Sequence, residues 1–375
     1  MAVKIGVIRE QASGERRVAL VPEVAKKLAA AGMSLVIQRG AGLAAGFPDA
    51  AYGDVEWFDD AGAVYAAADV VFAVQPPSPA LVSRLRRGAA LIGALAPYRE
   101  QALVRALRDG GISAFALELL PRTTRAQAMD ILSSQAAAAG YKAMLIAAEA
   151  APKFFPMLTT AAGTVRPSKV LVIGAGVAGL QAIATARRLG AMVEGFDVRP
   201  ETREQIESLG AKFLDLGVNA AGEGGYAREL TAEERARQQE ALAAHLKGID
   251  VVVTTAAVPG RAAPRIVSAA MVAGMKPGAV LVDLAAETGG NCELTRPGET
   301  VEHGGVAVIG PVNLPARTAT HASEMYARNL FTFAQLLVRD GALAVDFDDD
   351  LVAGSCLTHD GAVRHAATRE ALGHE

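Results

Sequence analysis

Residues 169–197 read KVLVIGAGVAGLQAIATARRLGAMVEGFD, and this stretch decides the fold. An apolar run that suits a buried strand leads into three glycines, and a helical pattern follows them. Gly174 permits a tight turn, Gly176 lets another molecule approach the backbone, and Gly179 lets the helix pack closely on the strand. A second apolar run then ends at Asp197. The stretch therefore predicts a strand, a glycine-rich turn, a helix and a second, parallel strand.

This pattern is typical of a dinucleotide-binding fold. The turn brings a helix N-terminus against a pyrophosphate, and a carboxylate after the second strand accepts hydrogen bonds from the adenosine ribose. We predict that Asp197 favours NAD(H) over NADP(H), because a 2′-phosphate would meet its negative charge. An arginine such as Arg199 can accommodate that phosphate, but we expect its side chain to be solvated. The predicted cofactor contacts are Gly174, Ala175, Gly176, Val177, Ala178, Gly179, Asp197, Val198 and Arg199.

Short apolar runs alternate with helical patterns along most of the chain, which is typical of parallel sheets covered by helices. We predict an α/β protein of two doubly wound parallel-sheet domains, the second a Rossmann domain, joined by long helices. The expected first domain is residues 1–133 plus 319–375, and the expected second domain is residues 134–318. The joining helical patterns cover about residues 126–154 and 323–337.

Composition narrows the functional classes. The formal net charge of −3 gives no positive field to attract nucleic acid. The chain has no apolar run long enough to span a bilayer, and its start reads as a strand, so we expect neither direct membrane insertion nor secretion. Its two cysteines and six histidines lack metal-ligand spacing, so we expect no metal.

Two further segments each allow two interpretations. The glycine-rich residues 217–226 end at Tyr226 and suit either a lid over bound nucleotide or an idle surface loop. Gln127, Asp130 and Ser133 have the spacing of one helix face, close to Arg122. They could serve a site, or they could only help a helix to start. The residues alone favour the second interpretation of this polar row.

Three stretches together resemble the alanine dehydrogenase and nicotinamide nucleotide transhydrogenase family: GERRVALVP at residues 14–22, PRTTRAQAMDILSSQ at residues 121–135, and the glycine turn. The similarity covers essentially the whole chain, and residues 121–135 resemble the transhydrogenase branch. The resemblance implies that Tyr226 belongs to a mobile loop. It also implies catalytic positions for residues that hold the nicotinamide end of NAD(H), namely Arg122, Gln127, Asp130 and Ser133.

The resemblance implies an activity as well. The chain would be the NAD(H)-binding component of a proton-translocating NAD(P) transhydrogenase, exchanging hydride directly with NADP(H) on a partner domain. Membrane-spanning and NADP(H)-binding partner subunits are implied with it, together with a homodimer. The chain would then be cytoplasmic and peripheral, held on the cytoplasmic face of the inner membrane through those subunits.

Two other functions stay open: an alanine-type amino-acid dehydrogenase and a nucleotide-binding regulatory module without chemistry. In the family's dehydrogenases a lysine and a histidine hold and deprotonate the substrate. Here the lysine position reads Gln75, and residues 93–97 contain no histidine. Oxidising an amine requires a proton acceptor, whereas passing hydride between two nicotinamides does not. This difference favours the transhydrogenase, although Arg17, which would meet a substrate carboxylate in the dehydrogenases, is present.

Overall fold

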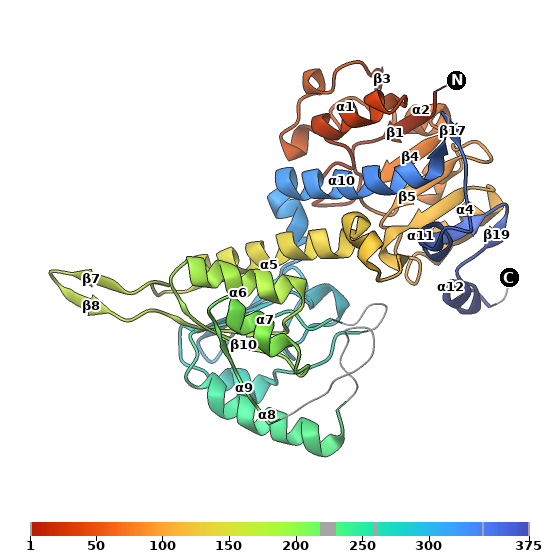
Figure 1. The fold of residues 1–375 in the computed structure, drawn as a ribbon. Helices are drawn as coiled ribbons and strands as arrows, with labels where there is room; N and C mark the ends of the chain where they lie inside the picture. The colour runs from red at the N-terminus through yellow and green to blue at the C-terminus, as the bar shows by residue number, and fades with distance from the viewer. Residues whose placement is uncertain (1, 218–229, 258–261, 340, 374–375) are drawn as a thin grey trace. The chain divides into compact units, whose positions relative to one another are not determined.

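The computed structural model describes residues 2–217, 230–257, 262–339 and 341–373 (Figure 1). Its contacts divide the chain into two compact units. Unit 1 consists of residues 1–135 and 315–375, and unit 2 of residues 136–314. These limits lie a few residues from the domain boundaries expected from the sequence. The chain thus leaves unit 1 once and returns to complete it.

Unit 1 contains a sheet of eight strands in the order β19-β18-β6-β5-β4-β1-β2-β3. Its parallel strands are β1 (Lys4–Val7), β2 (Ser34–Gln38), β3 (Glu56–Phe58), β4 (Val70–Ala73), β5 (Ala90–Gly93) and β6 (Ser113–Ala116). The returning chain adds β18 (Cys356–His359) antiparallel to β6, and β19 (Ala362–Val363) beyond it. The C-terminal residues therefore extend the first sheet.

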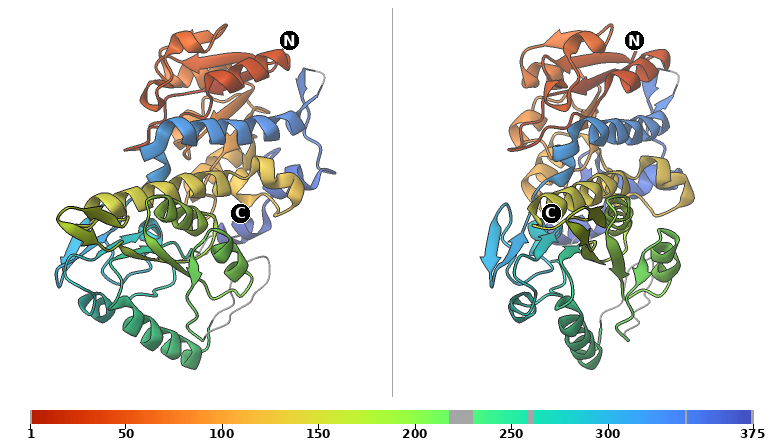
Figure 2. Two further views of the ribbon diagram at one scale, coloured as in Figure 1. Left: turned by 60° about the vertical axis from the view of Figure 1, so that its left-hand side comes forward. Right: turned by 90° about the vertical axis from the view of Figure 1, so that its left-hand side faces the viewer.

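Two apolar clusters cover the two faces of this sheet. One includes side chains of α1 (Pro22–Ala30) and α10 (Ala319–Leu337), and the other includes α2 (Ala61–Ala67), α3 (Pro79–Val82) and α4 (Gln101–Asp109). Figure 2 shows α10, in blue, running along the strands of unit 1. The smaller elements are η1 (Leu43–Ala45), η2 (Asp49–Ala51), η3 (Leu117–Leu119), η4 (Thr124–Met129), η6 (Leu314–Thr318), β16 (Val338–Arg339), β17 (Ala342–Leu343), α11 (Asp350–Ser355) and α12 (Ala366–Ala371).

Unit 2 contains a seven-stranded sheet in the order β11-β10-β9-β12-β13-β15-β14. Its parallel strands are β9 (Lys169–Ile173), β10 (Met192–Phe196), β11 (Lys212–Phe213), β12 (Val251–Thr254), β13 (Val280–Asp283) and β15 (Val306–Ile309), and β14 (Thr300–His303) pairs antiparallel to β15. The remaining elements are α6 (Val177–Arg188), α7 (Thr202–Ser208), α8 (Ala232–Leu246), α9 (Ala269–Ala273), η5 (Ala286–Thr288), and a hairpin of β7 (Leu158–Thr160) and β8 (Gly163–Val165).

The same strand order occurs in both parallel sheets. The first strand of each unit lies between the second and the fourth, so the order along the sheet is 3-2-1-4-5-6. Loops that follow the first and fourth strands run to opposite sides of the sheet, which leaves a crevice at the carboxyl ends of these strands. The predicted fold of two doubly wound domains is confirmed. It places the loops after β1 and β4, and those after β9 and β12, where ligands commonly bind.

The predicted joining helix at residues 126–154 is shorter in the structure. The helix α5 covers Ile131–Ala150, and residues 124–129 form the separate 3₁₀ turn η4. Asp130 has an extended backbone and accepts a hydrogen bond from the backbone N–H of Ser133, at 2.9 Å, so it caps the start of α5. Within unit 2, a Cβ atom on Gly140 would lie 2.0 Å from the Ala178 carbonyl oxygen, so α5 and α6 cross closely there.

The described part of the chain has no helix that is both long and apolar enough to cross a membrane.

Candidate functional site

The glycine turn of unit 2 has two structural glycines and one that faces open space. Gly174 has φ of +97°, and a Cβ on Gly179 would lie 1.7 Å from the Gly174 carbonyl oxygen. A side chain at either position would therefore strain the backbone or collide with it. A Cβ on Gly176 would meet no described protein atom within 4 Å. Packing does not require a glycine at this position, which suits a close approach by a ligand.

Helix α6 begins at this turn without a side-chain cap. Gly176 is its N-cap residue and makes no side-chain capping bond within the described chain. The first N–H groups of a helix lack partners inside the helix, and they attract anions such as phosphate. Of the neighbouring predicted contacts, Ala175 is buried while Val177 is 43% exposed. The turn can therefore present backbone donors to a pyrophosphate.

Asp197, which follows β10, is almost fully engaged by protein donors. Its Oδ2 accepts from the Ala175 N–H at 2.8 Å and from Arg199 Nη2 at 2.8 Å, and its Oδ1 accepts from the Arg199 N–H and Nε, each at 2.9 Å. Burial alone would raise the pKa of Asp197, but the bonds from Arg199 and Ala175 outweigh it, so this pKa lies below its usual value. The carboxyl group is thus ionised and already paired.

The expectation that Arg199 is solvated is wrong. Its side chain is 18% exposed and forms a bidentate ion pair with Asp197. A carboxylate has about four acceptor positions, and Arg199 and Ala175 together use four. A ribose hydroxyl can bond to Asp197 only if it replaces a bond from Arg199 or shares its oxygen. Val198 is half-buried and packs against the apolar cluster under the sheet.

In unit 1 the polar row of residues 122–133 is divided between two elements. Gln127 is exposed on η4, whereas Asp130 and Ser133 bond to each other at the start of α5, with 2.5 Å between Ser133 Oγ and Asp130 Oδ2. Arg122 is exposed before η4. The helix-starting role considered for Asp130 is therefore present, as the cap of α5. Tyr226 lies outside the described residues.

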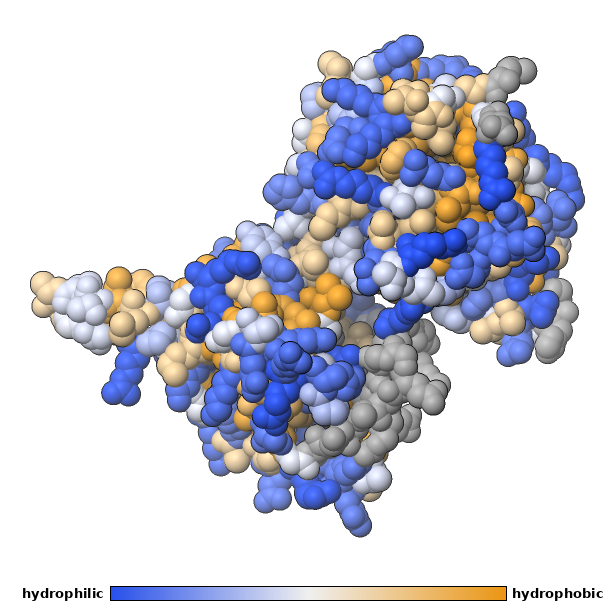
Figure 3. Space-filling view, viewed as in Figure 1, coloured by the Kyte–Doolittle hydropathy of each residue, from blue (hydrophilic) through white to orange (hydrophobic). Residues whose placement is uncertain are grey.

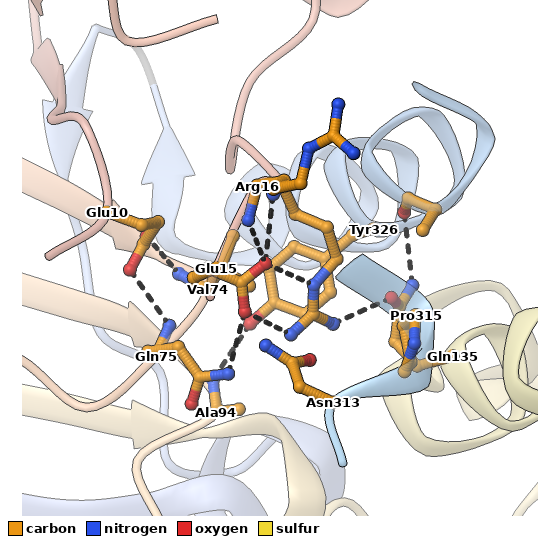
Figure 4. Close-up of polar contacts among 12 residues, drawn as sticks. Glu10, Glu15, Arg16, Val74, Gln75, Ala94, Gln135, Asn313, Pro315 and Tyr326 are labelled. Carbon is orange, nitrogen blue, oxygen red and sulfur yellow. Dashed lines mark hydrogen bonds and ion pairs between the residues drawn. The ribbon is translucent and has the colours of Figure 1, made fainter. Parts of the chain in front are cut away.

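A second polar cluster lies at the crevice of unit 1 (Figure 4), and of its members the sequence analysis named Arg17 and Gln75 but not Glu10 or Glu15. It combines Glu10, Glu15 and Arg17 from the loop after β1 with Gln75 from the loop after β4. Arg17 donates to both carboxylate oxygens of Glu15, from Nε at 2.9 Å and from Nη2 at 2.6 Å. Gln75 Nε2 donates to Glu15 Oε2 at 2.8 Å. The rule that polar groups gather beyond strand ends at the order reversal could have found it.

The remaining polar groups of this cluster also have hydrogen-bond partners. Arg17 is 7% exposed, and its Nη1 donates to Gln135 Oε1 at 2.8 Å. The Glu10 carboxyl group accepts from the backbone N–H groups of Val74, at 2.7 Å, and Gln75, at 3.2 Å. A small cavity of about 30 Å³ lies beside Glu10 and Gln75. The charged and amide groups of this cluster therefore bond to one another and to nearby backbone.

The two carboxyl groups of this cluster have opposite pKa shifts. Complete burial, with a smaller contribution from the charge of Glu15, raises the pKa of Glu10 to about 7. Burial also opposes ionisation of Glu15, but hydrogen bonds and charge from Arg17 outweigh it and lower the pKa of Glu15 to about 2. At neutral pH, one buried ion pair thus stands beside a carboxyl group that is poised to titrate.

The described residues contain no group of three or more His, Cys, Asp or Glu side chains that could hold a metal ion.

Comparisons with known proteins match this chain over nearly its whole length. Residues 6–139 match the family model "Alanine dehydrogenase/PNT, N-terminal domain", and residues 143–366 match the corresponding C-terminal domain. The chain is 44% identical over 384 aligned positions to the first part of the NAD(P) transhydrogenase alpha subunit of Rhodospirillum rubrum, covering 97% of this chain and 98% of the relative.

Solved structures agree with these matches. A transhydrogenase from Sinorhizobium meliloti has a TM-score of 0.86 at 42% identity, covering 97% of this chain and 99% of that one. An L-alanine dehydrogenase has a TM-score of 0.82 at 26% identity and covers 99% of both chains. The chain is thus nearer in sequence to the transhydrogenase than to the alanine dehydrogenase.

The glycine turn predicts different effects for two similar substitutions. Gly176→Ala adds a methyl group that meets no described protein atom, so the melting temperature should stay almost unchanged while NADH affinity falls about tenfold or more. Gly179→Ala forces its methyl group against the Gly174 carbonyl oxygen and should lower stability by about 1–3 kcal/mol. Calorimetric melting and NADH titration separate the two effects. Normal NADH affinity in Gly176→Ala would remove this turn from the binding site.

The raised pKa of Glu10 predicts a pH-dependent stability. Between about pH 4.5 and 7 the folded state holds more protons than the unfolded state, so the free energy of unfolding falls as pH rises through this window. Glu10→Gln cannot ionise and should lose this fall, which amounts to about 3 kcal/mol at most. The melting temperature of the variant relative to the unmutated chain should therefore rise from pH 5 to pH 8. The exposed Glu370→Gln serves as the control, and a flat difference for Glu10→Gln would contradict the assigned shift.

Proposed function

The chain belongs to the alanine dehydrogenase/PNT family, and we propose that it is the NAD(H)-binding component of a proton-translocating NAD(P) transhydrogenase. In this reaction a hydride passes directly between C4 of the nicotinamide of NAD(H) on this chain and C4 of the nicotinamide of NADP(H) on a partner chain. One ring is oxidised and the other is reduced. No proton is released from either ring, so the hydride step itself requires no general base.

The observation that carries this proposal is the polar cluster of unit 1, whose side chains already have hydrogen-bond partners within the protein. An amino-acid dehydrogenase needs a cation that is free to bind the substrate carboxylate and a base that can reach the amine. Arg17 is instead bound bidentately by Glu15, and Gln75 is an amide that cannot act as a base. The pKa of Glu10 is raised to about 7, but its carboxyl group is bound by the backbone N–H groups of Val74 and Gln75. These contacts disfavour the amino-acid dehydrogenase alternative.

We assign the two ends of NAD(H) to different segments of the chain. The uncapped start of α6 and the open position at Gly176 support binding of the pyrophosphate there. Asp197 would accept the ribose hydroxyls by displacing Arg199, and its charge favours NAD(H) over NADP(H). The nicotinamide end is assigned to Arg122, Gln127, Asp130 and Ser133. The Asp130–Ser133 bonds support this assignment because they give those two side chains a fixed geometry.

We propose that the second nucleotide is bound by a partner subunit. The sequence contains one glycine fingerprint with this strand and helix context, and the loop after β1 reads EQASGERR instead. The Rhodospirillum rubrum relative is named as one portion of a subunit, which supports an assembly of several chains. We propose that an NADP(H)-binding subunit and a membrane-spanning subunit complete the enzyme. They would hold this chain peripherally, on the cytoplasmic face of the inner membrane.

The hairpin β7–β8 supports a homodimer. It projects from unit 2, and all of its strand residues are exposed (Figure 1). Figure 3 shows pale and light orange side chains along it, and its apolar members include Leu158 at 38% exposure and Val165 at 45%. An isolated two-stranded hairpin is only marginally stable in water. A second copy of the chain would bury this apolar surface.

Hydride transfer tests the nicotinamide assignment. Gln127→Asn shortens one side chain by a methylene group, so NADH affinity should stay within about threefold while single-turnover transfer from NADPH to an NAD analogue falls about tenfold or more. The exposed Gln239→Asn on α8 serves as the matched control. Transfer by Gln127→Asn at the unmutated rate would reject the assignment. Oxidation of alanine by this chain alone would reject the proposed function.

Sedimentation tests the dimer. Leu158 and Val165 are directly paired across the hairpin, and Thr159 and Thr164 form the next pair, on the opposite face. The double variant Leu158→Ser with Val165→Ser should shift the chain toward monomer, because it removes apolar contact area. Thr159→Ala with Thr164→Ala, the control, should not. A dimer of unchanged stability in the first variant would exclude this face of the hairpin as the contact.

A further inference from the structure

Three buried polar side chains lie on one face of α10 in unit 1. Ser323, Tyr326 and Asn329 are spaced three residues apart, so they form a row along the helix. Their exposed fractions are 0%, 1% and 7%, and their helical neighbours Leu330 and Phe333 belong to the apolar core. Burying a polar group is costly unless it is hydrogen-bonded. The hydrogen-bond partners of these three side chains therefore indicate which parts of unit 1 they hold in place.

The first two members fasten the loops around the crevice of unit 1. Ser323 Oγ accepts from the backbone N–H of Val18 at 3.0 Å. The Tyr326 hydroxyl accepts from the Ala94 N–H at 2.9 Å (Figure 4). It also donates to the Ala73 carbonyl oxygen at 2.8 Å. Ala73 ends β4, and Ala94 directly follows β5. Both side chains thus tie backbone groups of separate loops to one rigid helix.

Asn329 does the same for the segment that carries Gln127 and Asp130. Its Nδ2 donates to the Ala128 carbonyl oxygen at 2.8 Å, in η4. Its Oδ1 accepts from Ser134 Oγ at 2.7 Å, in the first turn of α5. One amide group therefore holds the two elements on either side of Asp130. This tie adds to the Asp130–Ser133 bonds, which join the same two elements from within the segment.

We infer that Asn329 is a positioning residue for hydride transfer, acting through the segment of residues 127–133. This inference rests on the proposed function, which places the nicotinamide ring against that segment. The side chains of Ala126 and Met129 anchor η4 in the core, but apolar packing restrains rotation less than a directional hydrogen bond does. The bond to Ala128 fixes how η4 is turned, and hence where Gln127 lies.

The structure also indicates why the chain should still fold without the bond from Asn329 to Ala128. Ala128 lies at the surface, so little core packing depends on its bond to Asn329. Ser134 Oγ keeps a second acceptor, the Ile131 carbonyl oxygen at 3.2 Å. Transfer between two rings depends steeply on their distance and orientation, whereas binding of the whole nucleotide does not. Substitution of Asn329 should therefore affect the rate more than the affinity.

The experiment compares the hydride-transfer rates of two variants of the full chain. Each variant removes the hydrogen bonds of one side chain of α10. Asn329→Ala, assembled with the NADP(H)-binding partner, should transfer hydride from NADPH to an NAD analogue about tenfold more slowly, with NADH affinity within about threefold. Tyr326→Phe removes a buried hydroxyl that bonds to other loops, so it costs comparable stability but should retain the rate within about twofold. An unmutated rate in Asn329→Ala, or an equal loss in Tyr326→Phe, would overturn the inference.

Asn329→Asp separates the hydrogen bond from side-chain volume. An ionised carboxylate cannot donate to the Ala128 carbonyl oxygen, but a protonated carboxyl group can. The rate of this variant relative to the unmutated chain should therefore recover as the pH is lowered from about 8 to about 6, because burial raises the pKa of such a group. A relative rate that stays constant with pH would mean that Asn329 acts through packing alone, and would overturn the inference.

A measurement without the partner distinguishes this inference from the proposed function. NADH bound to the full chain alone should show faster decay of nicotinamide fluorescence anisotropy in Asn329→Ala than in the unmutated chain or in Tyr326→Phe. Identical decay in all three would overturn the positioning role of Asn329. Absence of hydride transfer in the unmutated complex would instead overturn the proposed function, while the anisotropy result still decides whether Asn329 orders the ring.

Discussion

The reversal of strand order beside the first strand is the constraint on which both units depend. It separates the loops that follow β1 and β4, and likewise those that follow β9 and β12, and so creates one crevice in each sheet. The two units treat this crevice differently. In unit 2 it is lined by backbone and left open at Gly176. In unit 1 the chain fills it with its own carboxylates, guanidinium and amide groups. A shared architecture thus yields one crevice suited to an anionic ligand and one whose polar groups bond to one another.

Charge is handled differently in the two crevices as well. In unit 2 the Asp197 carboxylate is buried, but the side chain of its partner Arg199 is 18% exposed and so reaches solvent. The Glu15–Arg17 pair of unit 1 is buried, and removing one partner would leave an uncompensated charge. A second full charge on Glu10 would add to that cost, which is why its carboxyl group keeps a proton up to near-neutral pH. The unit 1 cluster therefore favours a single fixed arrangement of its side chains. In unit 2, by contrast, a ligand can replace Arg199 as the partner of Asp197.

Features that depend on local pattern could be predicted from the sequence, and features that depend on distant partners could not. The glycine turn and the parallel strands follow from periodicity, so both folds were foreseeable. The joining helix was predicted too long because Asp130 is compatible with a helix interior, and only its bond to Ser133 shows that the helix starts there. The pairing of Arg199 and the burial of Glu10 depend on side-chain placement. The row on α10 has a helical spacing, but its partners lie about 200 residues or more away in the chain.

That separation has a consequence for synthesis on the ribosome. Unit 2 is continuous, so it can fold as soon as it emerges. Unit 1 begins first but lacks α10 until residues 136–314 have been made, which takes about ten seconds or more at typical elongation rates. During that interval Val18, Ala73, Ala94 and Ala128 lack the side chains that later hold their backbone groups. Residues 1–135 therefore stay incompletely folded until α10 is made, although unit 2, which is made after them, can already fold. Chaperone demand during translation should concentrate on the first unit to emerge.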